Sequence, residues 1–67
     1  MPLLQVHLLK GRPQTVKAEL VRELTEAVER VLGSPSERIS VLVTEYSAGE
    51  WNVAGVPLDL PVGAIDD

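Results

Sequence analysis

The side chains of this sequence that could carry out chemistry are few, and their scarcity excludes several kinds of site. The 67 residues include no cysteine and one histidine, His7. Disulfides and thiolate metal sites are therefore excluded, and a single imidazole cannot form a histidine cluster. His7 stands in a leucine-rich segment, where we expect a buried, hydrogen-bonded histidine rather than a catalyst. The sequence thus predicts no metal site.

Charge and hydropathy exclude two further classes of partner. The chain has six basic and ten acidic residues and a net charge of −4. A nucleic-acid-binding protein needs a concentrated basic surface, but no two basic residues are adjacent here. No stretch reaches the roughly 20 apolar residues that cross a membrane. No basic segment precedes an apolar core at the N-terminus, so we expect no signal peptide and a cytoplasmic location.

Hydrophobic periodicity predicts a helix between two strands. Residues 3–9 are apolar on both faces, which is typical of a strand buried on both sides in a parallel sheet. Residues 14–32 carry apolar side chains at steps of three and four, as an amphipathic helix does. Its apolar stripe comprises Val16, Leu20, Leu24, Ala27, Val28 and Val31. Pro13 suits the first helical position, and Gly33 suits a left-handed cap at the end.

The remaining segments complete a β-α-β unit. Lys17 and other charged residues fill the outer face of the helix, where Glu26 and Arg30 are spaced to form an ion pair. After the helix we expect a turn, a second doubly buried strand, a loop, a small hairpin and a tail, at residues 34–38, 39–46, 47–50, 51–56 and 57–67. Strands joined through a helix are parallel. The sequence predicts a single α+β domain over 1–67, with its β-α-β core at 2–46.

The small size of the chain predicts self-association. A domain of about 60 residues buries only roughly 60% of its unfolded surface, which leaves little stabilisation. Apolar residues nevertheless make up 45% of the sequence. One helix shields one face of a two-stranded sheet and leaves the other face open, and an exposed apolar face of this kind marks an interface. We therefore predict an obligate oligomer whose sheets continue or pack across subunits.

Several short motifs occur in an order along the chain that can be compared with known families. Pro2 directly follows Met1, His-Leu-Leu-Lys-Gly-Arg ends the first strand, Thr-Glu closes the second, and Trp-Asn-Val-Ala-Gly follows at 51–55. With the long helix between them, these features resemble the 4-oxalocrotonate tautomerase family from Pro2 to about Leu58. The resemblance implies subunits that pair into a four-stranded sheet, and three such dimers in a hexamer. Some relatives alternate two different chains, so a hetero-oligomer is a further expectation.

The resemblance also implies a mechanism. Removal of Met1 exposes Pro2 as a secondary amine, the general base in keto–enol tautomerisation of small 2-hydroxy-dienoate or 2-oxo acids. A free α-amine has a pKa of about 7.7–8.0, and a nearby arginine and an apolar wall lower this pKa further. Arg12 matches the arginine that binds the substrate carboxylate, and Trp51 matches an aromatic position on the pocket wall. Such a reaction requires no metal or organic cofactor.

One position departs from the family pattern. Where family members carry a second arginine that polarises the substrate carbonyl, this chain has Ser40. A hydroxyl brings no positive charge, and losing an oxyanion-stabilising donor costs on the order of 10²–10³ in rate. Arg38 can substitute only if the second strand begins after it and leaves its side chain free to swing. Arg38 and Ser40 therefore join Pro2, Arg12 and Trp51 as candidate site residues.

Alternatives to a tautomerase remain open. The same amine, with a different partner at the carbonyl, could support hydration, dehalogenation or decarboxylation of a small unsaturated acid. The chain could also be a non-catalytic subunit of a mixed oligomer whose other chain supplies the missing arginine. Glu45, at a strand end, is expected to meet a partner charge or solvent. Glu50, beside Trp51, could approach the pocket mouth, and neither glutamate is assigned a role.

Overall fold

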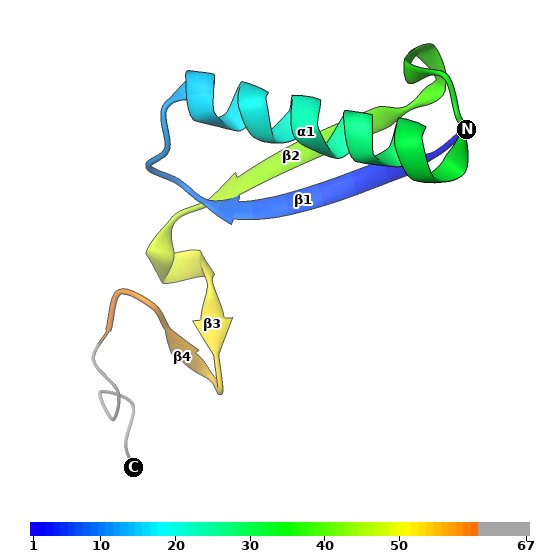
Figure 1. Cartoon of the computed structure of the whole chain (residues 1–67). Helices are drawn as coiled ribbons and strands as arrows, with labels where there is room; N and C mark the ends of the chain where they lie inside the picture. The colour runs from blue at the N-terminus through cyan, green and yellow to red at the C-terminus, as the bar shows by residue number, and fades with distance from the viewer. Residues whose placement is uncertain (61–67) are drawn as a thin grey trace.

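Two parallel strands and one long helix form the body of the chain (Figure 1). The computed structural model describes residues 1–60. Its elements are β1 (Leu3–Leu9), α1 (Gln14–Leu32), β2 (Ser40–Tyr46), β3 (Asn52–Val53) and β4 (Val56–Pro57), with single 3-10 turns at Ser36–Arg38 and Ala48–Glu50. β1 and β2 pair in parallel, and β3 and β4 form a short antiparallel hairpin. The predicted β-α-β unit and C-terminal hairpin are therefore confirmed, whereas the predicted tail lies outside the described residues from 61 onward.

The ends of α1 are set by Pro13 and Gly33. Gly33 adopts a left-handed φ of 72° and donates its N–H to the Glu29 carbonyl at 2.9 Å, as predicted. Pro13 is not the first helical residue, because its ψ of 156° is extended. It instead precedes the helix, and its carbonyl accepts the N–H groups of Val16 and Lys17. This residue therefore acts as the N-cap, without a side-chain hydrogen bond.

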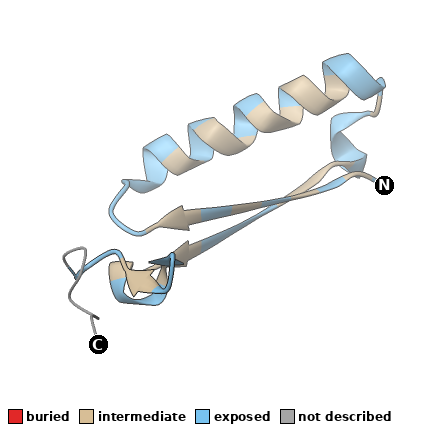
Figure 2. Cartoon of the chain, turned by 90° about the horizontal axis from the view of Figure 1, so that it is seen from below, coloured by how far each residue is buried: buried red, intermediate tan, exposed pale blue. Residues whose placement is uncertain are grey.

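The sheet has one covered and one open face. Along β1, Leu4, Val6 and Leu8 are half-buried beneath α1, while the alternating residues Leu3, Gln5 and His7 are exposed. No residue from 1 to 60 is fully buried, as the absence of red in Figure 2 shows. The expectation of doubly buried strands and of a buried His7 is thus wrong for the single chain. The physical reason is that α1 covers only one side.

The helix is longer than the sheet it covers. Nineteen helical residues span about 28 Å, and a seven-residue strand spans about 20 Å. The helix therefore extends beyond the sheet, and two residues of the predicted apolar stripe are not covered. Val16 is 48% exposed and Val31 is 74% exposed. Lys17, predicted on the outer face, instead reaches the sheet, where its Nζ lies 2.8 Å from Glu45 Oε1. The expectation that Glu45 meets a partner charge is confirmed.

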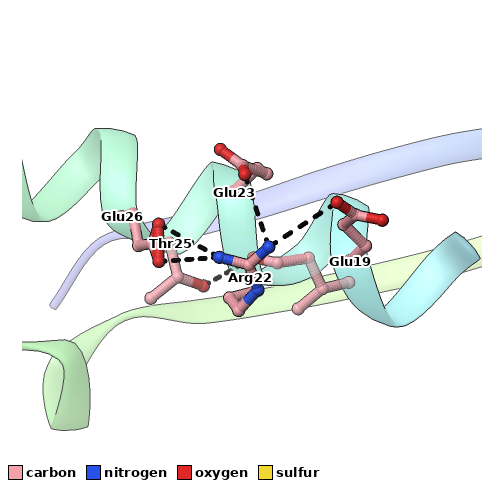
Figure 3. A network of polar contacts seen from close by, with 6 residues as sticks. Glu19, Arg22, Glu23, Thr25 and Glu26 are labelled. Atoms are coloured by element: carbon pink, nitrogen blue, oxygen red, sulfur yellow. Dashed lines mark hydrogen bonds and ion pairs between the residues drawn. The ribbon is translucent and has the colours of Figure 1, made fainter. Parts of the chain in front are cut away.

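The outer face of α1 carries an ion-pair network around Arg22 (Figure 3). Arg22 donates to Glu26 at 3.0 Å and lies 3.4 Å from Glu23 and 3.7 Å from Glu19. The hydrogen bond to Glu26, with the surrounding negative charges, raises the pKa of Arg22 above its usual range. Glu26 therefore pairs with Arg22 and not with Arg30 as predicted. These side chains are exposed, and such pairs contribute little to stability.

The shape of the single chain differs from that of a self-contained domain. Its radius of gyration is 16.3 Å, and its extents are 52 × 22 × 14 Å. A compact domain of this length has a radius of gyration of about 11 Å. The accessible surface is 5065 Å², whereas a folded monomer of this mass exposes about 4,200 Å². Both quantities fit the predicted oligomer, in which neighbouring chains would supply further contacts.

Replacing Leu42 tests whether the open face is an interface. Leu42 pairs with Gln5 on the open face and is 53% exposed. We expect the wild-type protein to sediment well above 7.3 kDa and Leu42→Glu to sediment as a smaller species, because a carboxylate cannot be buried unpaired. Leu42→Met conserves volume and should retain the assembly. A wild-type monomer at all concentrations in analytical ultracentrifugation would contradict the prediction.

Candidate functional site

Pro2 lies at the amino end of the sheet. It precedes β1, is half-buried, and its carbonyl accepts the N–H of Ser40 at 3.0 Å. In the intact chain the Pro2 nitrogen is bonded to Met1 in a tertiary amide and is not basic. Met1 is 91% exposed and therefore accessible to removal. Cleavage after Met1 would create a secondary amine at a position fixed by the sheet.

Arg38 and Ser40 stand beside this end of the sheet. The N–H groups of Arg38 and Ile39 close a 3-10 turn by bonding to the carbonyls of Pro35 and Ser36. β2 therefore begins at Ser40, one residue later than predicted. Arg38 precedes the strand, is exposed, and forms no ion pair with any residue from 1 to 60. Because β2 begins after Arg38, the Arg38 side chain is free to change its direction, as the substitution for the missing arginine requires.

Arg12 lies at the opposite, carboxyl end of the sheet. The Lys10 N–H bonds to the Tyr46 carbonyl at 2.8 Å, and Gly11, at a φ of 129°, turns the chain away from β1. Arg12 then folds back and donates from Nη1 to the Leu9 carbonyl at 3.1 Å. Its guanidinium is exposed and pairs with no carboxylate in the described part of the chain. A planar guanidinium of this kind binds a carboxylate through two parallel hydrogen bonds.

Trp51 lies near the same carboxyl end, after the 3-10 turn Ala48–Glu50. Its ring is half-buried and meets the Tyr46 ring edge-on, with centroids 5.9 Å apart at 85°. Tyr46 in turn stacks on His7 at 5.7 Å and shares a 2.7 Å hydrogen bond with its Nδ1. No motif in the sequence predicted a role for Tyr46. Its one signal was its identity as the only other aromatic residue, at the end of a strand.

The turn before Trp51 is held by Glu50. Ser47 donates from both its hydroxyl and its N–H to Glu50 Oε1, at 2.7 and 3.2 Å. These hydrogen bonds stabilise the carboxylate and lower the pKa of Glu50. The predicted loop at 47–50 is thus an ordered capping box, in which the Glu50 carboxylate bonds to Ser47 and closes the turn directly before Trp51.

The five predicted site residues therefore form two groups. The amino-end group consists of Pro2, Arg38 and Ser40, and the carboxyl-end group consists of Arg12 and Trp51. β1 separates them, and its seven residues span about 20 Å. A single chain does not bring Pro2 and Arg12 together. A small acid can contact both only if the two groups come from different chains.

Two hollows on the surface of residues 1–60 lie apart from both groups. One, of about 390 Å³, is apolar and lies on the hairpin between Val53 and Leu60. Another, of about 240 Å³, lies beside the Lys17–Glu45 pair. Across residues 1–60, no three histidine, aspartate or glutamate side chains gather as a metal site requires. No helix in that range is long and apolar enough to span a membrane.

Comparison with known proteins gives consistent matches. A family model described as "Tautomerase enzyme" matches residues 2–60. A probable tautomerase of Ralstonia nicotianae is 47% identical over 57 residues, which cover 85% of this chain and 81% of that protein. A 2-hydroxymuconate tautomerase of Pseudomonas putida is 39% identical over 57 residues, covering 85% of this chain and 90% of that protein.

A solved structure extends the similarity to three dimensions. A heterohexamer 4-oxalocrotonate tautomerase from Chloroflexus aurantiacus has a chain that superposes with a TM-score of 0.82 at 31% identity. The match covers 87% of this chain and 94% of that one. The arrangement of two parallel strands with a helix between them is therefore also found in a solved relative.

Proposed function

This chain belongs to the tautomerase family of enzymes, and on that premise we propose that it catalyses keto–enol tautomerisation of small 2-hydroxy-dienoate or 2-oxo acids without a cofactor. The observation that carries the proposal is the position of Pro2. This residue follows an exposed Met1 and is tied through its carbonyl to Ser40. A 2-hydroxymuconate tautomerase is among its relatives. The named relatives support tautomerisation over hydration, dehalogenation or decarboxylation.

Three residues of the proposed mechanism act on the proton and on the carboxylate end of the substrate. Once Met1 is removed, the neutral Pro2 nitrogen takes a proton from the substrate and leaves an enolate. It then returns the proton to a carbon further along the conjugated chain, so that no atom is gained or lost. Arg12 holds the substrate carboxylate through two hydrogen bonds. Trp51 excludes water, and an apolar surrounding keeps the amine neutral.

The site is proposed to form between chains. The amino-end group of one chain would face the carboxyl-end group of another, which requires the two chains to run in opposite directions. The separation of about 20 Å along β1 supports this arrangement. The open sheet face and the extended shape support an oligomer. We propose a hexamer, the number of chains in the heterohexameric relative, built from dimers with four-stranded sheets as the family resemblance implies.

The carbonyl end of the substrate is assigned to Arg38. Ser40 cannot supply a positive charge, whereas Arg38 lies two residues earlier in the chain, exposed and outside the strand. Two residues span at most about 7 Å, which is within the reach of an arginine side chain. We therefore assign to Arg38 the stabilisation of the enolate oxygen.

Replacing Pro2 tests the general base. Mass spectrometry of the purified protein should show a chain that lacks Met1. Pro2→Ala should lower kcat for 2-hydroxymuconate, followed by ultraviolet absorbance, by about 10²-fold or more, because general-base catalysis supplies a factor of this size. Pro13→Ala, at the helix N-cap, is the matched control and should keep most activity. Wild-type rates in Pro2→Ala would contradict the mechanism.

A mixing experiment tests whether the two groups come from different chains. Pro2→Ala and Arg12→Ala chains, each inactive alone, are unfolded together at equal amounts and refolded. If each site takes Pro2 from one chain and Arg12 from another, random assembly restores about a quarter of the wild-type activity. If both residues came from one chain, no mixture would recover activity.

Replacing Arg38 tests its role at the carbonyl. Arg38→Ala should lower kcat by about 10²-fold, since an oxyanion-stabilising donor is worth this much, and should change KM far less. Ser40→Ala should change kcat only slightly. Arg30→Ala, an exposed arginine on α1, is the control for loss of surface charge. An Arg38→Ala enzyme with an unchanged kcat would remove Arg38 from the mechanism.

A further inference from the structure

Three side chains from separate segments meet on the open face of the sheet. His7 comes from the middle of β1, Tyr46 from the end of β2 and Trp51 from beyond the following turn. The Tyr46 ring is stacked on His7 at 5.7 Å and meets Trp51 edge-on at 5.9 Å. Its hydroxyl shares a 2.7 Å hydrogen bond with His7. The phenol is therefore held from two sides and cannot rotate away without losing all three contacts.

This cluster lies at the same end of the sheet as Arg12. Tyr46 pairs with Leu9 in the parallel register, and the Tyr46 carbonyl accepts the N–H of Lys10. Arg12 follows two residues later and bonds back to Leu9. The Tyr46 ring therefore stands between the end of β1, which anchors Arg12, and Trp51.

We infer that Tyr46 forms, together with Trp51, a rigid aromatic wall that limits the width of the substrate, and that His7 is the positioning residue for this wall. The inference rests on the proposed function, since it takes Trp51 as part of the pocket. A carboxylate held by Arg12 places the next carbons of the acid beside these rings. Narrow, unbranched unsaturated acids fit there, whereas an acid that carries a phenyl ring meets the fixed phenol.

The first test compares two substrates of different width. The ratio of kcat/KM for 2-hydroxymuconate to that for phenylenolpyruvate is measured for each variant. Tyr46→Ala should lower this ratio by about tenfold or more, the size expected when a pocket wall is removed. Tyr46→Phe and His7→Leu should each lower it by a smaller and similar amount, since both release the ring. Gln5→Ala, on the same open face but outside the cluster, should leave the ratio unchanged.

The second test measures binding without catalysis. Trp51 is the only tryptophan, so its fluorescence reports binding of two unreactive acids, adipate and 3-phenylpropionate. Tyr46→Ala should favour 3-phenylpropionate over adipate relative to wild type. If Tyr46→Ala shifts the selectivity in this way but the wild-type protein has no tautomerase activity, the proposed function is rejected and the aromatic wall is retained. Unchanged selectivity in a folded Tyr46→Ala or Tyr46→Phe protein would reject the wall and retain the function. If Tyr46→Phe alone dissociated the oligomer, the cluster would serve to hold chains together and not to limit the substrate, and the inference would be overturned.

Discussion

An extended strand is stiff, and its length of about 20 Å is the constraint on which the organisation of this protein depends. β1 begins beside Pro2 and ends shortly before Arg12, so the candidate base and the candidate carboxylate anchor cannot approach each other within one chain. The same strand exposes half of its side chains on a face that α1 does not cover. The proposed chemistry and the open face of the sheet therefore both require a second chain.

The regular elements could be predicted from the sequence because each has a local cause. The helix at Gln14–Leu32 follows from apolar periodicity and from Gly33, and β1 follows from a short apolar segment bounded by a turn. Apart from local errors at Pro13, at the start of β2 and in the pairing of Glu26, the errors concern contacts between elements. The bond between Lys17 and Glu45 joins residues 28 positions apart, and the bond between His7 and Tyr46 joins residues 39 apart. No periodicity encodes such pairs.

The candidate site could likewise be predicted from the sequence only in part. Pro2, Arg12 and Trp51 were identified by motifs whose order resembles a family, and their grouping at two ends of the sheet follows from the strand between them. The freedom of Arg38 could not be read from the sequence, because it depends on the 3-10 turn that takes the Ile39 N–H out of the strand. The role of Ser47 and Glu50 in holding Trp51 is likewise a property of the folded turn.

The distribution of the two residue groups over opposite ends of the chain has a consequence for evolution. In the proposed arrangement, each copy would contribute an amine to one reaction centre and a guanidinium to a different one. After a gene duplication, one descendant could lose its amine and the other its guanidinium, and the pair would still build intact centres together. Division of labour between unequal subunits, as in a heterohexamer, would then require no new fold and no new catalytic group.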